Sequence, residues 1–401
     1  MTRAQLFSGS LILSALTIVG SVGYLNSRKR SIPIVFSAKS MLAELWNTYK
    51  RNTLEPGSFR TLDKQKDNIT TSEGESYTML RAVWEDDKPT FDISLKWTRD
   101  NLKRPSDSLP SWLYGERPDG TYGILTNRNG QNTASDADTD MALSLIFAGS
   151  RWNDSAYLDT ANFMVRDIWR QDVVIVAGKP VMTGNNQEQF NPKQVIVNPS
   201  YFAPYAYSIF ARIDPTHDWL GLRTNMYSIV DQASAQPLDA ARSANIPPDW
   251  IALNRSTGVI MALGSADQTT HFSYDAMRLP FRLALDYEWN KAPEAKLLLA
   301  HFGFLDQQWK VGGKILTAYD HLGAPVAPLQ EAPAIYGGTL GYFISADPAA
   351  ADQIYIFKLR SLYDPNKQSW TTTLGYYDDN WAWFGMALYL HQLPNLAAPH
   401  A

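Results

Sequence analysis

Pairs of amphipathic helices recur along this chain, and they constrain its fold more than any other feature. Residues 76–84 are expected to form one helix, a polar break follows at 86–89, and residues 90–102 are expected to form a second helix with Phe91, Leu95 and Trp97 on one face. Residues 140–152 and 155–169 repeat this layout about sixty residues further on. Such a repeat predicts one helical hairpin per period.

Looser copies of the hairpin follow. Their expected ranges are 201–211 with 220–232, 274–287 with 292–307, 341–346 with 349–362, and 380–390 alone. An early helix at 37–50 can supply the missing outer partner and close a ring. We therefore predict an all-α fold, an (α/α)6 barrel of six helical hairpins in a toroid, as a single domain over residues 37–395 with a tail at 396–401. An irregular helical bundle is the alternative.

The first thirty residues differ from the rest of the chain. Leu6 to Leu25 is a run of about 20 residues without a charge, which is long enough to span a bilayer. We predict an N-terminal transmembrane helix in an anchor at residues 1–30, followed by a linker at 31–36. A cleaved signal peptide is the alternative, with Arg3 as its charged start. The basic residues 28–30 follow the span, so the charge rule argues mildly against export of the following chain.

Charge and cysteine content narrow the possible partners. The net charge is −4 without a broad basic field, which argues against a nucleic-acid partner. The absence of cysteine excludes disulfides, thiol catalysis and cysteine metal sites. The six histidines lack the paired spacing of zinc sites, and the glycine pairs at 312–313 and 337–338 lack the lysine of a phosphate loop. We expect no metal, no cofactor, and a monomer.

Carboxylates and aromatic residues are concentrated where the predicted inner helices begin. They are Glu73, Asp136, Asp138, Tyr201, Tyr274, Asp275, Tyr376, Tyr377, Asp378 and Trp381. If the inner helices run parallel, these positions meet at one mouth of the ring. A single acidic residue at a helix start is more often a cap or a partner of the helix dipole. A pair such as Glu73 and Asp275 could instead supply the protonated carboxyl and the ionised carboxylate that inverting glycoside hydrolysis needs.

Four segments, in register, resemble glycoside hydrolase family 8. They are TSEGESYTML at 71–80, NTASDADTDMAL at 132–143, NPSYFAP at 198–204 and YDAMRLP at 274–280, with Trp97, Trp112 and Trp152 as further landmarks. Several motifs in one order are more specific than one short pattern. The resemblance runs from about Ser37 to Leu393. It implies an inverting, endo-acting glycoside hydrolase that cleaves a β-1,4-linked glucan or a related exopolysaccharide.

The resemblance also implies roles for the carboxylates. Glu73 corresponds to the general acid, Asp275 to the general base, and Asp136 to the position that holds the distorted sugar at the cleavage point. Glu73 must then carry a proton near neutral pH. We expect burial, or a neighbouring carboxylate such as Asp136, Asp138 or Glu75, to raise its pKa.

Further residues are expected to support the reaction. Arg278, one helical turn after Asp275, could hold the charge of the base, and a plain surface ion pair is the alternative. Tyr201 and Tyr274 are candidates to orient the water or contact the central sugar, with packing as the alternative. The remaining expected substrate contacts are Trp112, Tyr114, Asp138, Trp152, Tyr376 and Trp381.

Two positions depart from the family's pattern, Glu75 and Thr78, where a neutral residue and a glycine are more usual. An added carboxylate near the cleavage point could favour an amino sugar, so a chitosanase is one alternative. A non-catalytic polysaccharide-binding or synthesis-accessory protein is another. Because such polymers lie outside the membrane, we expect an anchored catalytic domain outside the cytoplasm, periplasmic or extracellular, or a protein secreted after signal cleavage.

Overall fold

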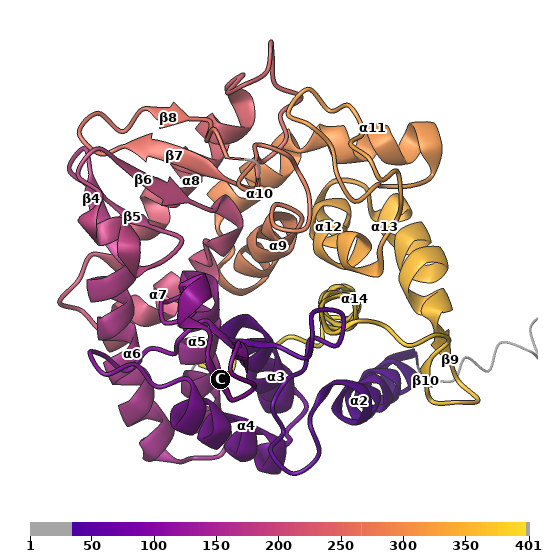
Figure 1. The fold of residues 1–401 in the computed structure, drawn as a ribbon. Helices are drawn as coiled ribbons and strands as arrows, with labels where there is room; N and C mark the ends of the chain where they lie inside the picture. The colour runs from indigo at the N-terminus through magenta and orange to yellow at the C-terminus, as the bar shows by residue number, and fades with distance from the viewer. Residues whose placement is uncertain (1–33, 266, 398–401) are drawn as a thin grey trace, which may run out of the picture.

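The helices of this chain form two concentric rings (Figure 1). The computed structural model describes residues 34–265 and 267–397. Each inner helix contacts the next one, and the last contacts the first. The inner helices are α3 (Ser72–Trp84), α5 (Ser135–Arg151), α7 (Pro204–Ile213), α9 (Arg278–Asn290), α12 (Pro333–Ala346) and α14 (Tyr376–Tyr389).

The outer helices pack against the inner ones in sequence order. They are α4 (Lys88–Asn101), α6 (Ser155–Asp172), α8 (Trp219–Ala235), α10 (Pro293–His301), α11 (Gly303–Gly312), α13 (Pro348–Ile354) and α2 (Ile34–Thr53). Helix α2 packs against α14 and so provides the outer partner that the last inner helix lacks. It begins at Ile34, within the range predicted as a linker.

Burial explains why one member of each pair lies inside. In α6, the buried side chains include Tyr157, Ala161, Val165 and Ile168, which recur at helical spacing on one face. The Asp154 side chain caps this helix by accepting a hydrogen bond from the backbone N–H of its first turn. In α5, by contrast, every residue from 135 to 149 is buried. A helix buried on all sides belongs to the inner ring.

Several boundaries differ from the prediction. Helix α5 begins at Ser135 rather than at 140, and α9 begins at Arg278, so Tyr274 and Asp275 lie in the turn before the helix. The fourth outer segment is split into α10 and α11.

Helix α12 was predicted too short because its glycines weaken the helical pattern. Those glycines allow close packing. A Cβ on Gly337 would lie 1.9 Å from the carbonyl oxygen of Trp381, and one on Gly341 would lie 2.4 Å from that of Pro280.

The all-α prediction was incomplete, because the connections carry short antiparallel strands. One sheet has the order β1 (Thr70–Thr71), β2 (Leu113–Glu116), β3 (Tyr122–Ile124), and another has β6 (Gln194–Val197), β7 (Ile251–Asn254), β8 (Ile260–Met261). Two hairpins are formed by β4 (Val173–Val176) with β5 (Lys179–Met182), and by β9 (Tyr363–Asp364) with β10 (Ser369–Trp370). Strands of two to four residues are too short to give a periodic sequence signal.

The predicted membrane span lies outside the described residues. Within residues 34–265 and 267–397, no helix combines the length and apolar character needed to cross a membrane.

Candidate active site

The first turns of α3 and α5 meet at the side chain of Arg278, in the first turn of α9. Helix α3 is capped by Thr71, whose hydroxyl accepts the backbone N–H of Gly74, and this cap places Glu73 in the first turn. The N–H of Ser72 donates to the carbonyl of Trp112, which ties this helix start to the sheet of β1 to β3.

Arg278 connects the three predicted carboxylates. Its Nη1 lies 2.9 Å from Glu73 Oε2 and 2.9 Å from Asp136 Oδ2, and its Nη2 pairs with Asp275 Oδ1. Its Nε and Nη2 also donate to Ser200 Oγ, at 3.1 and 2.9 Å. The Arg278 side chain is only 1% exposed. It is therefore a buried cation that holds the site together, and the surface ion pair considered as an alternative does not describe it.

The carboxyl of Glu73 is the group best placed to hold a proton. Burial raises its pKa to about 7, helped by the charges of Asp136 and Asp275 and opposed by Arg278. Tyr376 donates a hydrogen bond from its hydroxyl to Glu73 Oε1 at 2.8 Å, which also opposes the rise. The expected burial effect is thus present, and Asp136 is the predicted neighbour that contributes.

The other two carboxylates differ in exposure. The Asp136 side chain is 3% exposed and that of Asp275 is 31% exposed. Burial raises the pKa of Asp136, and the positive charges of Arg278 and Arg282 oppose this rise. Asp275 also accepts a hydrogen bond from the indole N–H of Trp250, at 3.0 Å on Oδ2.

A second ion pair joins α5 and α9, one helical turn beyond Asp136 and Arg278. Arg282 binds both carboxylate oxygens of Asp140, at 3.1 and 2.9 Å, and its Nη1 is 2.7 Å from the hydroxyl of Tyr205. Asp136 and Asp140, like Arg278 and Arg282, are four residues apart, so each pair shares a helix face. This spacing was the available signal for Asp140 and Arg282, which the sequence analysis missed.

Several predicted aromatic residues lie at this site. The ring of Tyr201 faces the Arg278 guanidinium at 5.0 Å, and Tyr376 contacts Glu73. Tyr274 is 39% exposed, and its backbone carbonyl accepts the hydroxyl of Tyr377. Tyr377 was expected at the mouth of the ring, but no role in the site was assigned to it.

The predicted residues of β1 to β3 lie beside the start of α3. Trp112 packs against the small apolar cluster of that sheet, and its indole N–H donates to the carbonyl of Asn129. Tyr114 pairs with Thr70 and packs its ring against Trp97 at 5.2 Å.

Four residues expected near the cleavage point lie elsewhere. Trp152 follows the last residue of α5, at the opposite end of that helix from Asp136, and it packs on Phe91. Trp381 is 2% exposed in the core, with Phe281 at 5.4 Å. Neither ring is available as a sugar platform.

The other two are carboxylates that face away from the site. Glu75 accepts the backbone N–H of Thr61 and the hydroxyl of Ser94, so it gives no support to an amino-sugar substrate. Asp138 is fully buried beside Asp172. Burial is the main cause that raises the pKa of Asp138 well above its usual range, and the negative charge of Asp172 is the next.

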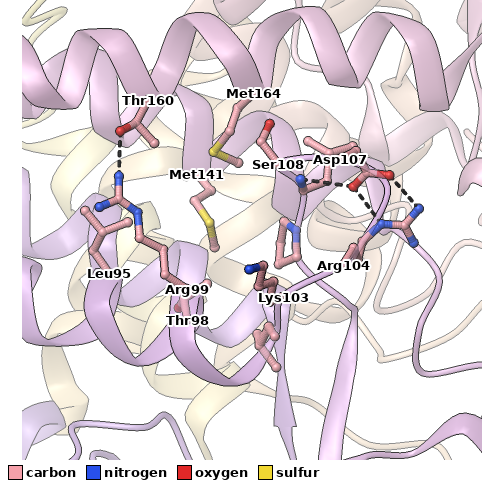
Figure 2. A pocket seen from close by; sticks show the side chains of 13 residues that line it. Leu95, Thr98, Arg99, Lys103, Arg104, Asp107, Ser108, Met141, Thr160 and Met164 are labelled. Carbon is pink, nitrogen blue, oxygen red and sulfur yellow. Dashed lines mark hydrogen bonds and ion pairs between the residues drawn. The ribbon is translucent and has the colours of Figure 1, made fainter.

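A cavity of about 320 Å³ opens on the outer wall between α4 and α6, lined by Arg99, Arg104, Met141 and Met164 among others (Figure 2). None of the three site carboxylates lines it. Within the described ranges, no group of three histidine, aspartate or glutamate side chains is arranged to hold a metal ion.

Comparison with known proteins establishes the family. Residues 27–308 match Glycosyl hydrolases family 8, and the chain belongs to this family. It is 29% identical over 267 residues to an endoglucanase of Salmonella typhi, and 31% identical over 239 residues to an endoglucanase of Escherichia coli K12. These alignments cover 64% and 58% of this chain. They span 65% and 60% of the relatives, which is less than two thirds of their own length.

Solved structures share the fold over most of their length. The endo-1,4-D-glucanase of Vibrio fischeri ES114 superposes with a TM-score of 0.70 at 23% identity, covering 86% of this chain and 94% of its own. Endoglucanase Cel10 of Klebsiella pneumoniae gives 0.68 at 24% identity, covering 87% and 99%. The resemblance recognised in the sequence is therefore confirmed, as is a mostly helical fold of this family.

Proposed function

We propose that this protein is an inverting, endo-acting hydrolase of β-1,4-linked glucan. The observation that carries the proposal is the shared contact of Glu73, Asp136 and Asp275 with one buried arginine, with the pKa of Glu73 raised to about 7. The curated relatives of Salmonella typhi and Escherichia coli K12 are named endoglucanases, which supports a glucan as the substrate.

In the proposed reaction, the protonated Glu73 carboxyl donates its proton to the glycosidic oxygen as the bond from that oxygen to the anomeric carbon breaks. A water molecule attacks the anomeric carbon from the opposite face, and Asp275 accepts a proton from that water. The products are an alcohol and a hemiacetal of inverted configuration. Glu73 is left ionised and Asp275 protonated, and proton exchange with solvent restores the starting state.

The environments of the two carboxyl groups support this division of roles. The side chain of Glu73 is the more buried, at 19% exposure against 31% for Asp275. Burial favours the neutral form that a general acid needs. Asp275 accepts hydrogen bonds on both oxygens, from Arg278 and from Trp250, and these contacts hold its carboxylate in place. Glu73 binds Nη1 and Asp275 binds Nη2 of the Arg278 guanidinium, so the two carboxyl groups are held at separate positions.

The proposal is tested by sugar release from neutral hydroxyethylcellulose, lichenan, xylan and chitosan. We expect a rapid fall in the viscosity of hydroxyethylcellulose with few new reducing ends, because endo cleavage cuts within the chain. Release from chitosan alone would favour the chitosanase alternative. Tight binding to a polymer without release from any of them would favour the polysaccharide-binding or synthesis-accessory alternative.

The stereochemistry is tested separately by NMR of fresh product. A β-linked substrate should give the α-anomer first, and mutarotation should then produce the β-anomer. Initial appearance of the β-anomer would remove the base role from Asp275.

The finer architecture and the location are also proposals. We take the chain to form an (α/α)6 barrel as one monomeric domain over residues 37–395, which its two rings of helices support. We further propose that residues 1–30 anchor it with the domain outside the cytoplasm. Protease added to spheroplasts, whose outer membrane has been opened, should then remove the domain, and complete protection would contradict this topology.

A further inference from the structure

The loop before β7 contacts the turn that carries the candidate general base. We propose that Asp249 and Trp250, in this loop, are positioning residues that fix the orientation of Asp275. This inference rests on the proposed function, in which Asp275 must face a water molecule.

Trp250 determines where one oxygen of the base lies. Its indole N–H donates to Asp275 Oδ2 at 3.0 Å, while Oδ1 of the same carboxylate pairs with Arg278. Because each oxygen has its own donor, the orientation of the carboxylate is restricted. The remaining lone pairs can then accept the proton of a water in one defined direction.

The Trp250 ring is itself held in place. Its edge packs on the ring of Tyr201, with centroids 5.6 Å apart at an angle of 68°. On another side it lies against the backbone of Gly184, where a Cβ would come within 3.2 Å of its Cζ3 atom. Its backbone N–H donates to the carbonyl of Thr269 at 3.0 Å. The indole therefore has little freedom to move away from the base.

Asp249 holds the backbone of the turn itself. Its Oδ1 accepts the N–H groups of Ser273 at 3.0 Å and of Ala276 at 2.7 Å, which lie on either side of Tyr274 and Asp275. The hydroxyl of Ser273 donates to Oδ2. Asp249 is 4% exposed, so these bonds are protected from water.

The hydrogen bonds from the turn to Asp249, called the cap below, do not require a charge on Asp249. Burial, followed by the negative charge of Asp275, raises the pKa of Asp249 to about 7. Both backbone N–H groups bind the same oxygen, which the amide of an asparagine can supply equally well. Asp249→Asn should therefore preserve the turn, whereas Asp249→Ala should release it.

The main test is Trp250→Phe, which keeps the ring packing and removes the indole N–H. We expect kcat on hydroxyethylcellulose to fall about tenfold or more, with KM changed less than about threefold. The loss should fall on kcat rather than on KM, because the candidate base loses a donor while the substrate contacts are unchanged. Trp46→Phe is the matched control. It removes an indole N–H that lies 3.0 Å from Asp87 on the outer wall, and its kcat and KM should match those of the wild type.

The Asp249 variants test the cap by rescue. We expect kcat within about threefold of the wild type for Asp249→Asn and a loss of about tenfold or more for Asp249→Ala. Equal losses in both Asp249 variants, or a wild-type kcat in Trp250→Phe, would overturn the positioning roles.

A readout that needs no activity separates this inference from the proposed function. In protein labelled with ¹⁵N-tryptophan, the indole resonance that is missing from Trp250→Phe identifies Trp250. That resonance should shift upfield in Asp275→Ala, and the resonance of Trp46 should stay in place. An unshifted Trp250 resonance would refute the contact. Inactivity of the wild type on every polymer, with the shift observed, would refute only the proposed glucanase.

Discussion

The hydrogen bond from Tyr376 to Glu73 gives a direct test of the general acid. The pKa of Glu73 is raised to about 7, and the hydroxyl of Tyr376, 2.8 Å from Oε1, stabilises the ionised form. Tyr376→Phe removes that donor, so the pKa of Glu73 should rise further, by roughly half a unit to one unit. At pH 8 the protonated fraction of the acid would then increase from about one tenth to between a quarter and a half.

The assay is the pH dependence of kcat/KM on hydroxyethylcellulose, an uncharged polymer whose own ionisation does not distort the profile. The wild type should lose activity as the pH rises through about 7, because the acid must be protonated. Its alkaline limb should move upward in Tyr376→Phe, so that activity at pH 8 relative to pH 6 increases about three- to fivefold. Tyr389→Phe is the control. It removes a phenol that contacts Asp352 near the other end of α14. An alkaline limb that stays in place or moves downward in Tyr376→Phe would contradict Glu73 as the proton donor.

Three further predictions concern catalysis and stability. Glu73→Gln and Asp275→Asn should each lower kcat by about 10² or more with little change in the melting temperature, and wild-type turnover in either would refute the roles. The pKa of Asp138 is higher in the folded protein than in the unfolded chain, so wild-type stability should fall as the pH rises above about 4. The melting temperature of Asp138→Asn should therefore equal that of the wild type at pH 4 and be higher than it at pH 8. Arg282→Met leaves the buried Asp140 unpaired and should cost about 3–5 kcal/mol, which lowers the melting temperature by roughly 3–6 °C, and Asp140→Leu in the same chain should recover most of that loss.

The ring of helix pairs and the meeting of two of its carboxylates could both be predicted from the sequence. The helical periodicity predicted the pairs, and the early helix at 37–50 was correctly assigned as the outer partner of the last inner helix. Glu73 and Asp136 stand in the first turns of neighbouring inner helices, so a parallel arrangement of those helices was enough to bring them together. The contact of both with Arg278 depends on how the whole ring closes, because 205 residues separate Glu73 from Arg278.

Helix geometry could have corrected two of the misplaced residues. Glu75 and Asp138 each follow a site carboxylate by two positions, which turns the side chain about 200° around the helix axis. Both accordingly point to the outer side of their helices, Glu75 toward Ser94 and Asp138 toward Asp172. Trp152 could also have been corrected, since the predicted helix already ended at 152 and so placed Trp152 at the opposite end from Asp136.

The way in which one arginine serves three carboxylates explains why the proton belongs on Glu73. Arg278 supplies a single positive charge, so the ionised cluster would be strongly negative in a buried site, and one proton relieves that repulsion. Asp136 is more buried than Glu73. However, Asp136 lies near a second cation, Arg282, and accepts the backbone N–H of Ala137 at 2.8 Å, and both contacts lower its pKa. In the described part of the chain, Arg278 is the only ion-pair partner of Glu73. The hydroxyl of Tyr376 adds one hydrogen bond. Arg282, one turn further along α9, therefore favours a proton on Glu73 rather than on Asp136, as the proposed role of Glu73 requires.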